Sequence, residues 1–500
     1  TTFTPDKSAD LTSYADITKS VTVEYKKVGV KGQSIWVSPD GKSDAAGTKA
    51  DPMDLPTAVK YAQPGQTIVM MDGEYTKSVT IDRSVSGTAD KMITLMAENT
   101  GKAVFTGGAG LTIVGSYWHV YGIKAVGSAG VGIQVGGNYN VIEMCVTQAC
   151  ANSGLQISRS QGSATNAQGI EGLLWPSYNL IKNCESFDNM DAGKNDADGF
   201  AAKLTCGEGN KFYGCSSHNN IDDGWDLFAK VISGPIGAVT IENCIAYDNG
   251  ILTDGSEKTL GEGNGFKLGG GYLKGGHVLK NSIAFNNLGK GITSNSCPDV
   301  EIYNCISYGN LINDGDGYNI GLNTSTSNEK AWVVEGVISM NKKANTKYED
   351  LIPFNLINEK NYIYNGEASF NSLGEEAVDK WFVSVDVSKK PTRNENGTIN
   401  MGGLLELTAD SQAARPGVGA VLDVTSDDAI SVAPTIPTES GGNVGDGGDD
   451  SQGGNTGDGG NNSPGTGDSN NALPFAVAMM VSVVLLAGAA ICGKKRKIFE

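Results

Sequence analysis

The chain has 500 residues, about three times the usual length of a single domain, so several domains or an elongated repeat are expected rather than one compact core. The 68 glycines show no G-x-y period, which excludes collagen, and a hydrophobic content of 39% excludes a wholly disordered chain. The formal net charge of −18 argues against a nucleic-acid partner, but it is compatible with an acidic polysaccharide if a metal cation mediates the contact.

The first part of the chain predicts an entry segment and a cap. The chain begins Thr1-Thr2-Phe3 without a methionine, which we interpret as the trace of a removed export signal, and residues 1–33 form an N-terminal extension. Residues 54–62 predict a short amphipathic helix with Asp54 as N-cap and Pro56 in its first turn. This helix would protect the N-terminal edge of the main domain, 34–436, from strand addition, and the first strand after the helix is expected at 65–70.

A repeat runs through the middle of the chain. Similar segments surround five positions, at successive spacings of 31, 29, 38 and 23 residues, with a weaker copy around Cys145: Cys184, Cys215, Cys244, Ser282 and Cys305. Apolar residues alternate within each copy, which indicates strands rather than helices. Short strands repeating at this period, with loops of variable length, predict an all-β fold, a parallel β-helix.

Stacking of the repeats would align equivalent residues in columns about 4.8 Å apart. One column is an asparagine ladder: Asn189, Asn220, Asn249, Asn287 and Asn310. Another is rich in aromatic rings: Phe187, His218, Tyr247, Phe285 and Tyr308. We interpret the cysteine column as small buried hydrophobic residues rather than disulfides or metal ligands, and His218 as a ladder member rather than a ligand.

A second register is set by a glycine followed by a large apolar residue: Gly199-Phe200, Gly224-Trp225, Gly265-Phe266, Gly291-Ile292 and Gly317-Tyr318. This register brings four carboxylates into two adjacent rungs: Asp198, Asp222, Asp223 and Asp226. Two carboxylates about 5 Å apart repel by roughly 3 kcal/mol at an effective dielectric near 20, so the cluster should protonate or hold a cation. An all-oxygen set suits Ca²⁺ better than zinc or Mg²⁺, and a solvated acidic surface is the alternative.

Lys267 is the other departure from the repeat. It is expected one rung beyond Asp226 in the same column, with glycines on both sides that leave a shallow open groove. A nearby cation would lower the pKa of this amine and make it a general base. The alternative is an exposed lysine that neutralises Asp226.

The repeat fades from about Trp381 to Val424, which we interpret as a C-terminal cover. Residues 437–471 predict a flexible linker, because 10 of the 23 residues at 440–462 are glycine. Residues 472–500 predict a transmembrane helix with a basic cytoplasmic tail, since 472–492 carries no charge. The S-P-G-T-G motif at 463–467 resembles the signal that sortases cut between Thr and Gly; the alternative is a plain single-span anchor.

These ends predict an extracellular protein held at the Gram-positive cell wall or membrane, with sortase and peptidoglycan as partners, and we expect a monomer.

A divalent cation beside an amine base on an extended sheet suits β-elimination from a polyuronate, in which the base removes the C5 proton and the C4 oxygen leaves. Glycoside hydrolysis fits less well, because it needs two carboxyl groups flanking the bond. A non-catalytic β-helix adhesin is a third possibility.

Three motifs resemble polysaccharide lyase family 9: D-A-D-G-F-A-A-K-L at 196–204, N-N-I-D-D-G-W-D-L-F at 219–228 and G-N-G-F-K-L-G-G at 263–270. The likeness runs from about Ile35 to Ala420. It implies a right-handed parallel β-helix pectate lyase that acts on pectate, an acidic plant polysaccharide. It further implies Lys267 as the base and Ca²⁺ held by four ligands: Asp198, Asp222, Asp223 and Asp226. Rhamnogalacturonan lyases belong to the same family, and the loop at 256–262 looks longer than usual.

Overall fold

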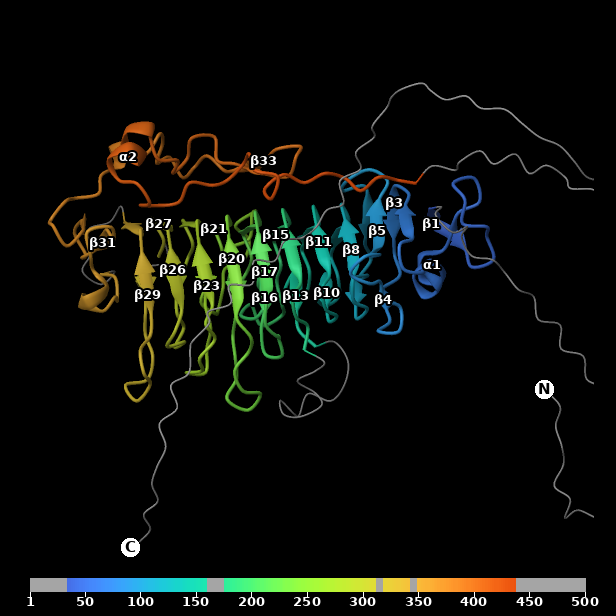
Figure 1. Ribbon diagram of the computed structural model, residues 1–500, viewed down its shortest axis with the longest axis horizontal. Helices are drawn as coiled ribbons and strands as arrows, with labels where there is room; N and C mark the ends of the chain where they lie inside the picture. The colour runs from blue at the N-terminus through green and yellow to red at the C-terminus, as the bar shows by residue number, and fades with distance from the viewer. Residues whose placement is uncertain (1–33, 160–174, 312–317, 342–348, 438–500) are drawn as a thin grey trace, which may run out of the picture. The chain divides into compact units, whose positions relative to one another are not determined.

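The computed structural model describes residues 34–159, 175–311, 318–341 and 349–437, all within one compact unit (Figure 1). The predicted extension at 1–33, the linker and sorting motif beyond Pro437 and the apolar span at 472–492 lie outside these ranges. Among the described residues, no helix is both long and apolar enough to cross a membrane.

The described chain winds into a parallel β-helix, as the repeat predicts. Successive turns stack side by side along the horizontal direction of Figure 1, in chain order from blue to yellow. Each turn contributes to three parallel sheets, called here A, B and C, whose neighbouring strands come from consecutive turns.

Sheet A has eleven strands: β1 (Ile35–Lys42), β2 (Thr67–Met70), β5 (Ile93–Ala97), β8 (Trp118–Tyr121), β11 (Val141–Glu143), β14 (Leu180–Lys182), β17 (Asn210–Tyr213), β20 (Val239–Glu242), β23 (Val278–Lys280), β26 (Glu301–Tyr303) and β29 (Val333–Glu335). Sheet B has ten: β3 (Gly73–Tyr75), β6 (Ala103–Phe105), β9 (Lys124–Val126), β12 (Val146–Gln148), β15 (Glu185–Phe187), β18 (Ser216–His218), β21 (Ile245–Tyr247), β24 (Ile283–Phe285), β27 (Ile306–Tyr308) and β30 (Ile338–Met340). Sheet C has nine: β4 (Val79–Ile81), β7 (Leu111–Ile113), β10 (Ile133–Val135), β13 (Leu155–Ile157), β16 (Phe200–Ala202), β19 (Trp225–Asp226), β22 (Phe266–Lys267), β25 (Ile292–Thr293) and β28 (Ile320–Gly321).

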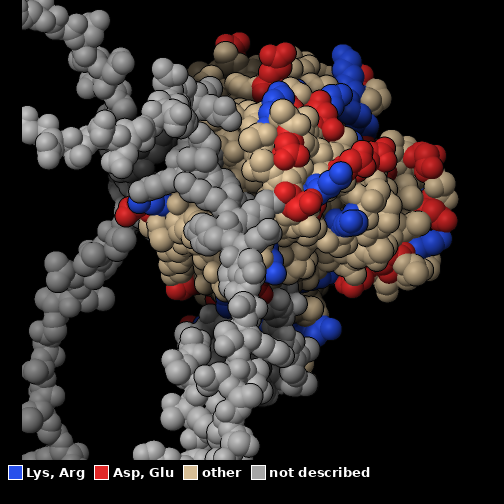
Figure 2. Space-filling model, turned by 90° about the vertical axis from the view of Figure 1, so that its right-hand side faces the viewer, with Lys and Arg blue, Asp and Glu red and all other residues tan. Residues whose placement is uncertain are grey.

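The N-terminal cap is confirmed in its details. Helix α1 (Leu55–Tyr61) begins after Asp54, whose carboxylate accepts a hydrogen bond from the backbone N–H of Thr57 at 2.8 Å, and Pro56 lies in its first turn. The strand predicted after the helix is confirmed as β2, and β1, which precedes the helix, pairs with it. Figure 2 views this end, where acidic and basic side chains are interspersed among uncharged ones.

The predicted columns are present. The asparagine amides bond from rung to rung; for example, Asn189 donates to Asn220 at 2.7 Å. Phe187, His218 and Tyr247 stack with ring centroids 4.8 and 4.7 Å apart, which confirms His218 as a ladder member. The eight cysteines in the described ranges are buried and unbridged, as expected for small hydrophobic residues.

The glycine register is confirmed for four rungs and wrong for the fifth. Phe200, Trp225, Phe266 and Ile292 pair in succession. Ile292 then pairs with Ile320, not with Tyr318, so Asn319 takes the position that glycine holds in the earlier rungs. The neighbouring turn closes through the Asn319 carbonyl, which accepts a hydrogen bond from Ser307 at 2.9 Å, and this contact does not depend on glycine.

The C-terminal residues make two different covers. Residues 349–377, with a short 3-10 helix (Phe354–Leu356) and the hairpin of β31 (Ile363–Tyr364) and β32 (Ser369–Phe370), continue the end of the coil through a bridge from Ile338 to Tyr362. The segment 381–437 then returns along the coil toward β1, as an orange-to-red strap in Figure 1. It follows a second 3-10 helix (Asp379–Trp381) and contains β33 (Thr392–Arg393), β34 (Ile399–Asn400) and helix α2 (Ala409–Ala414). The predicted C-terminal cover therefore lies lengthwise along the coil rather than across its end.

Candidate active site

The candidate site lies on the outer face of sheet C. In a strand, alternate side chains point to opposite faces, so Trp225 points into the core while Asp226 points outward. Inside, Trp225 stacks between Phe200 and Phe266 with ring centroids 4.9 Å apart on each side. Outside, Asp226 pairs laterally with Lys267 on the next rung, as the register predicts. The inner aromatic stack thus holds β16, β19 and β22 in the alignment that the outer residues need.

Three of the four predicted acidic residues converge where β16 and β19 begin. Asp198, Asp222 and Asp223 each place a carboxylate oxygen within 4.8 Å of the others, and all three are buried. Asp198 accepts hydrogen bonds from the Ser153 hydroxyl at 3.0 Å and from the Asp223 backbone at 3.3 Å. We call these residues the carboxylate triad.

The loop before β22 completes the surroundings of the triad. Asp223 accepts two hydrogen bonds from Asn264, from its backbone and its side-chain amide, each at 2.8 Å. Asp222 accepts one from the backbone of Glu262 at 3.0 Å. Gly224 is required here, because a Cβ at this position would lie 2.6 Å from the Gly265 carbonyl oxygen.

Burial makes the triad costly to ionise. It raises the pKa of Asp222 to about 9, with the negative charges of Asp223 and Asp198 adding to the shift. Burial also raises the pKa of Asp198 to about 7, even though the Lys203 ammonium works in the opposite direction. If all three carboxyl groups are ionised, their negative charge therefore exceeds what the neighbouring protein groups neutralise.

Asp226, the fourth predicted ligand, lies outside the triad and between two lysines. Its carboxylate is 3.3 Å from the Lys203 ammonium and 3.9 Å from that of Lys267, and it accepts a hydrogen bond from the Phe228 backbone at 3.0 Å. Lys203 also contacts Asp198 at 2.7 Å and Asp196 at 3.0 Å. Burial alone would lower the pKa of Lys203, but these carboxylates raise it well above its ordinary value.

Lys267 points into the same groove from β22. Its Nζ lies 3.0 Å from Asp223 and 3.2 Å from Glu262, a residue of the loop at 256–262. Burial would lower the pKa of Lys267, yet Asp223, Asp226 and Glu262 outweigh it and raise the pKa. Without a further cation, Lys267 therefore holds its proton.

The triad fits a hard divalent cation. Its donors are all carboxylate oxygens, and they are buried and close together. Asp223 Oδ2 accepts no hydrogen bond from the residues that the structure describes, although the Lys267 ammonium lies 3.0 Å away as an ion pair. Such a donor set suits Ca²⁺. Asp198, Asp222 and Asp223 would hold the ion, and Asp226 on the adjoining strand shares the Lys203 ammonium with Asp198.

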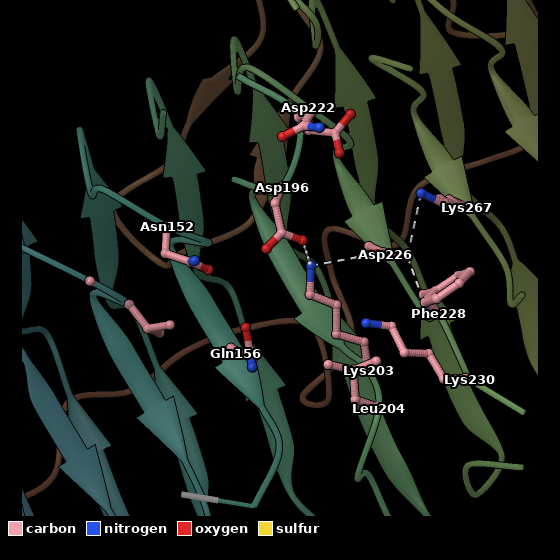
Figure 3. A pocket seen from close by; sticks show the side chains of 13 residues that line it. Asn152, Gln156, Asp196, Lys203, Leu204, Asp222, Asp226, Phe228, Lys230 and Lys267 are labelled. Carbon is pink, nitrogen blue, oxygen red and sulfur yellow. Dashed lines mark hydrogen bonds and ion pairs between the residues drawn. The ribbon is translucent and has the colours of Figure 1, made fainter. Parts of the chain in front are cut away.

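The groove has a volume of about 560 Å³, and Figure 3 shows the side chains that line it. The sequence suggested that the glycines around Lys267 leave the groove open, but the Phe228 ring covers one of them, Gly270. A Cβ at Gly270 would lie 2.1 Å from the Phe228 ring, so this glycine lets the ring rest against the backbone of the next rung. Lys267 Nζ lies 5.7 Å from the centre of that ring.

Sequence reasoning missed three residues of the site: Lys203, Glu262 and Phe228. For Lys203 a signal was available, because it lies two positions after Ala201, which pairs with Asp226, and so shares the outer face of the sheet. Glu262 offered no comparable signal, since its place depends on the path of an irregular loop.

Comparison with known proteins identifies the family. Residues 35–330 match the family model described as "Pel9A-like, right handed beta helix region". Pectate lyase L of Thermoclostridium stercorarium is 43% identical over 390 residues, which cover 76% of this chain and 30% of that protein. Pectate lyase L of Paenibacillus polymyxa (strain SC2) is 35% identical over 398 residues, which cover 77% of this chain and 83% of that protein.

Two solved structures share the fold. The crystal structure of pectate lyase Pel9A is 28% identical with a TM-score of 0.60, covering 77% of this chain and 91% of that one. A structure titled rhamnogalacturonan lyase also has a TM-score of 0.60 and covers 77% of this chain and 99% of that one. At 21% identity, this second likeness concerns the fold alone.

Proposed function

Because this chain belongs to the Pel9A-like right-handed β-helix family, a family of polysaccharide lyases, we propose that it is a Ca²⁺-dependent pectate lyase. The observation that carries the proposal is the buried carboxylate triad beside Lys267 on one face of sheet C. The reaction is β-elimination along α-1,4-polygalacturonate, which yields an unsaturated uronide without consuming water.

The residues of this chain divide the work. Asp198, Asp222 and Asp223 hold the ion, with Asp226 beside them. Bound Ca²⁺ supplies positive charge that makes the C5 proton of the uronate more acidic. Lys267 Nζ faces the groove and takes the C5 proton, and the glycosidic oxygen leaves from C4. Phe228 and Asp226 set the position of the Lys267 amine from two sides.

Pectate is the preferred substrate in this proposal, because both curated relatives compared above are named pectate lyases. The test is ultraviolet absorbance from the unsaturated product, measured in parallel on polygalacturonate and on rhamnogalacturonan with added Ca²⁺. We expect product from polygalacturonate that a chelator abolishes. Product from rhamnogalacturonan alone would move the assignment to that substrate, and new reducing ends without absorbance would indicate a hydrolase.

The role of Lys267 has its own test. Lys267→Ala should lose turnover while Ca²⁺ still binds, because the triad remains in place; turnover is followed by absorbance and Ca²⁺ binding by calorimetry. Lys124→Ala on sheet B removes a lysine that is not among the described residues lining the groove, and it serves as the matched control. Measurable activity of the Lys267 variant at alkaline pH would contradict the assignment of Lys267 as the base.

We further propose that the enzyme works outside the cell, anchored through its C-terminus. This proposal rests on the sequence at 463–500, which lies beyond the described residues. Mass spectrometry of protein released from the cell wall is the test: a mature chain that ends at Thr466 would support sortase processing, and one that retains 472–492 would contradict it.

A further inference from the structure

The groove on sheet C contains a lysine that pairs with no carboxylate in the part of the chain that the structure describes. Lys230 lines the same groove as Lys203 and Lys267, and its side chain is exposed. Among the described residues no carboxylate forms an ion pair with Lys230, whereas Lys203 and Lys267 are each held by several. In a chain with 56 acidic and 38 basic residues, this leaves a cation in the groove free for a ligand.

The backbone around Lys230 is fixed. Its carbonyl oxygen accepts hydrogen bonds from the backbone N–H groups of Ser233 at 3.0 Å and Gly234 at 2.9 Å. The Ser233 hydroxyl donates a third at 3.1 Å. The backbone at Lys230 is therefore held in a hydrogen-bonded turn, and the position of the ammonium depends on the side-chain rotamer alone.

Phe228 separates Lys230 from the catalytic lysine. In Figure 3 its ring lies between Lys267 and Lys230. The ring is half-buried, it rests on Gly270, and its backbone N–H is bound by Asp226. An aromatic ring held in this way offers an apolar surface to the C–H face of a sugar, while the lysines on either side offer charge.

The opposite end of the groove has a different character. Toward β13 it is lined by Asn152 and Gln156 from the rungs before Lys203, and by Gly130 and Val131. Of the described residues, none that lines this end carries a positive charge. A uronate bound there would meet neutral amides, whereas one bound near Phe228 would meet the Lys230 ammonium.

We propose that Phe228 and Lys230 form a sugar subsite next to the cleavage position, in which the ring carries one face of the neighbouring uronate and Lys230 pairs with its carboxylate. This inference rests on the proposed function and adds a specificity to it. The enzyme prefers a free carboxylate on the sugar at the Lys230 side, and it tolerates a methyl ester on the sugar at the Gln156 side.

The test compares steady-state kinetics on polygalacturonate for wild type, Lys230→Ala, Lys230→Arg, Phe228→Ala and the control Lys124→Ala. An exposed ion pair contributes up to about 1 kcal/mol, so Lys230→Ala should raise KM about fivefold with kcat nearly unchanged. Lys230→Arg should restore the wild-type KM. Added salt should narrow the difference in KM between wild type and Lys230→Ala, because it screens the ion pair between Lys230 and the substrate carboxylate. Lys124→Ala should match wild type.

Substrates of defined esterification test the asymmetry. When the single methyl ester is on the Lys230-side sugar, wild type and Lys230→Ala should have the same KM, because the carboxylate that Lys230 pairs with is blocked. When the ester is on the Gln156-side sugar, the fivefold difference in KM between them should remain. A KM for Lys230→Ala equal to that of Lys124→Ala, or a fall in kcat alone, would overturn the subsite. Absence of unsaturated product with wild-type enzyme would instead overturn the proposed function, so the two failures are distinct.

Discussion

Replacing Lys203 tests the electrostatic account of the site most directly. Its side chain is 6% exposed, and its ammonium contacts Asp198 at 2.7 Å and Asp226 at 3.3 Å, two carboxylates that are themselves buried. Lys203→Met keeps most of the side-chain volume and removes the charge. Because it leaves buried carboxylates without their partner, it should destabilise the metal-free protein by about 3–5 kcal/mol. The exposed contact with Asp196 adds at most about 1 kcal/mol.

Calcium should reverse part of this loss, since a bound cation neutralises the same carboxylates. Urea unfolding in chelator and in saturating Ca²⁺ measures both losses, and Lys124→Met provides the matched control, expected within about 0.5 kcal/mol of wild type. If the loss in Ca²⁺ is smaller by about 1.4 kcal/mol, Ca²⁺ binds the variant about tenfold more tightly than wild type. An equal loss in both conditions would refute the reasoning, because Lys203 would then act independently of the cation site.

Two further predictions concern the scaffold. Burial lowers the pKa of His277 to about 4, so the folded state binds fewer protons than the unfolded state between that value and 6.5; stability should fall by up to about 3 kcal/mol as the pH drops through this range. His277→Asn should remove this pH-dependent loss, because asparagine does not titrate in this range, while its amide oxygen can replace Nδ1 as acceptor for the Val239 N–H. An unchanged pH profile of unfolding would exclude His277 as the cause. Asn243 binds the strap at Asp423 through its side-chain amide, whose nitrogen donates to the Asp423 carbonyl at 2.8 Å and whose oxygen accepts from the Asp423 backbone N–H at 2.6 Å. Asn243→Gly suits the positive φ of 58° and should speed proteolysis within 381–437 without changing lyase activity; unchanged cleavage would show that the strap is held elsewhere.

The sequence predicted the fold best where a rung carries its own marker. From Cys184 to Cys305 each copy places a small residue and an asparagine at fixed spacing, because the ladders require them, and these rungs were found. The earlier rungs, from β2 to β10, bury ordinary aliphatic residues and lack the marker, so self-comparison passed over them. The same reasoning explains the error at Tyr318: glycine marked the register, and Asn319 replaced it.

A second amide ladder was also missed. Asn140, Asn179 and Asn210 lie just before or at the start of strands of sheet A and bond to one another across rungs, for example from the Asn179 amide to Asn210 at 2.9 Å. The column continues through Val239 to His277. Because its members change type along the column, the pattern is weak in sequence although the geometry is regular.

The site was predictable to the extent that it follows the period of the coil. Asp226 and Lys267 are 41 residues apart in sequence, yet they pair directly, because the strand register fixes which residues meet whatever the length of the loop between them. Contacts made by long side chains across rungs do not follow that period. Lys203 contacts Asp226 on the next rung, and Glu262 comes from an irregular loop, so the strand period predicts neither contact.

The ion pairs made by the two lysines affect how the predicted carboxylates and the predicted base would act. Asp223 belongs to the triad and its Oδ2 is 3.0 Å from Lys267 Nζ, so the amine and a bound cation would share the same carboxylate. Asp198 is shared in the same way with Lys203. As long as the carboxylates are unneutralised, they keep Lys267 protonated and unfit to act as a base. Filling the triad weakens that hold, so the metal requirement of the proposed lyase resides partly in Lys267 itself, and not solely in the acidity of the substrate.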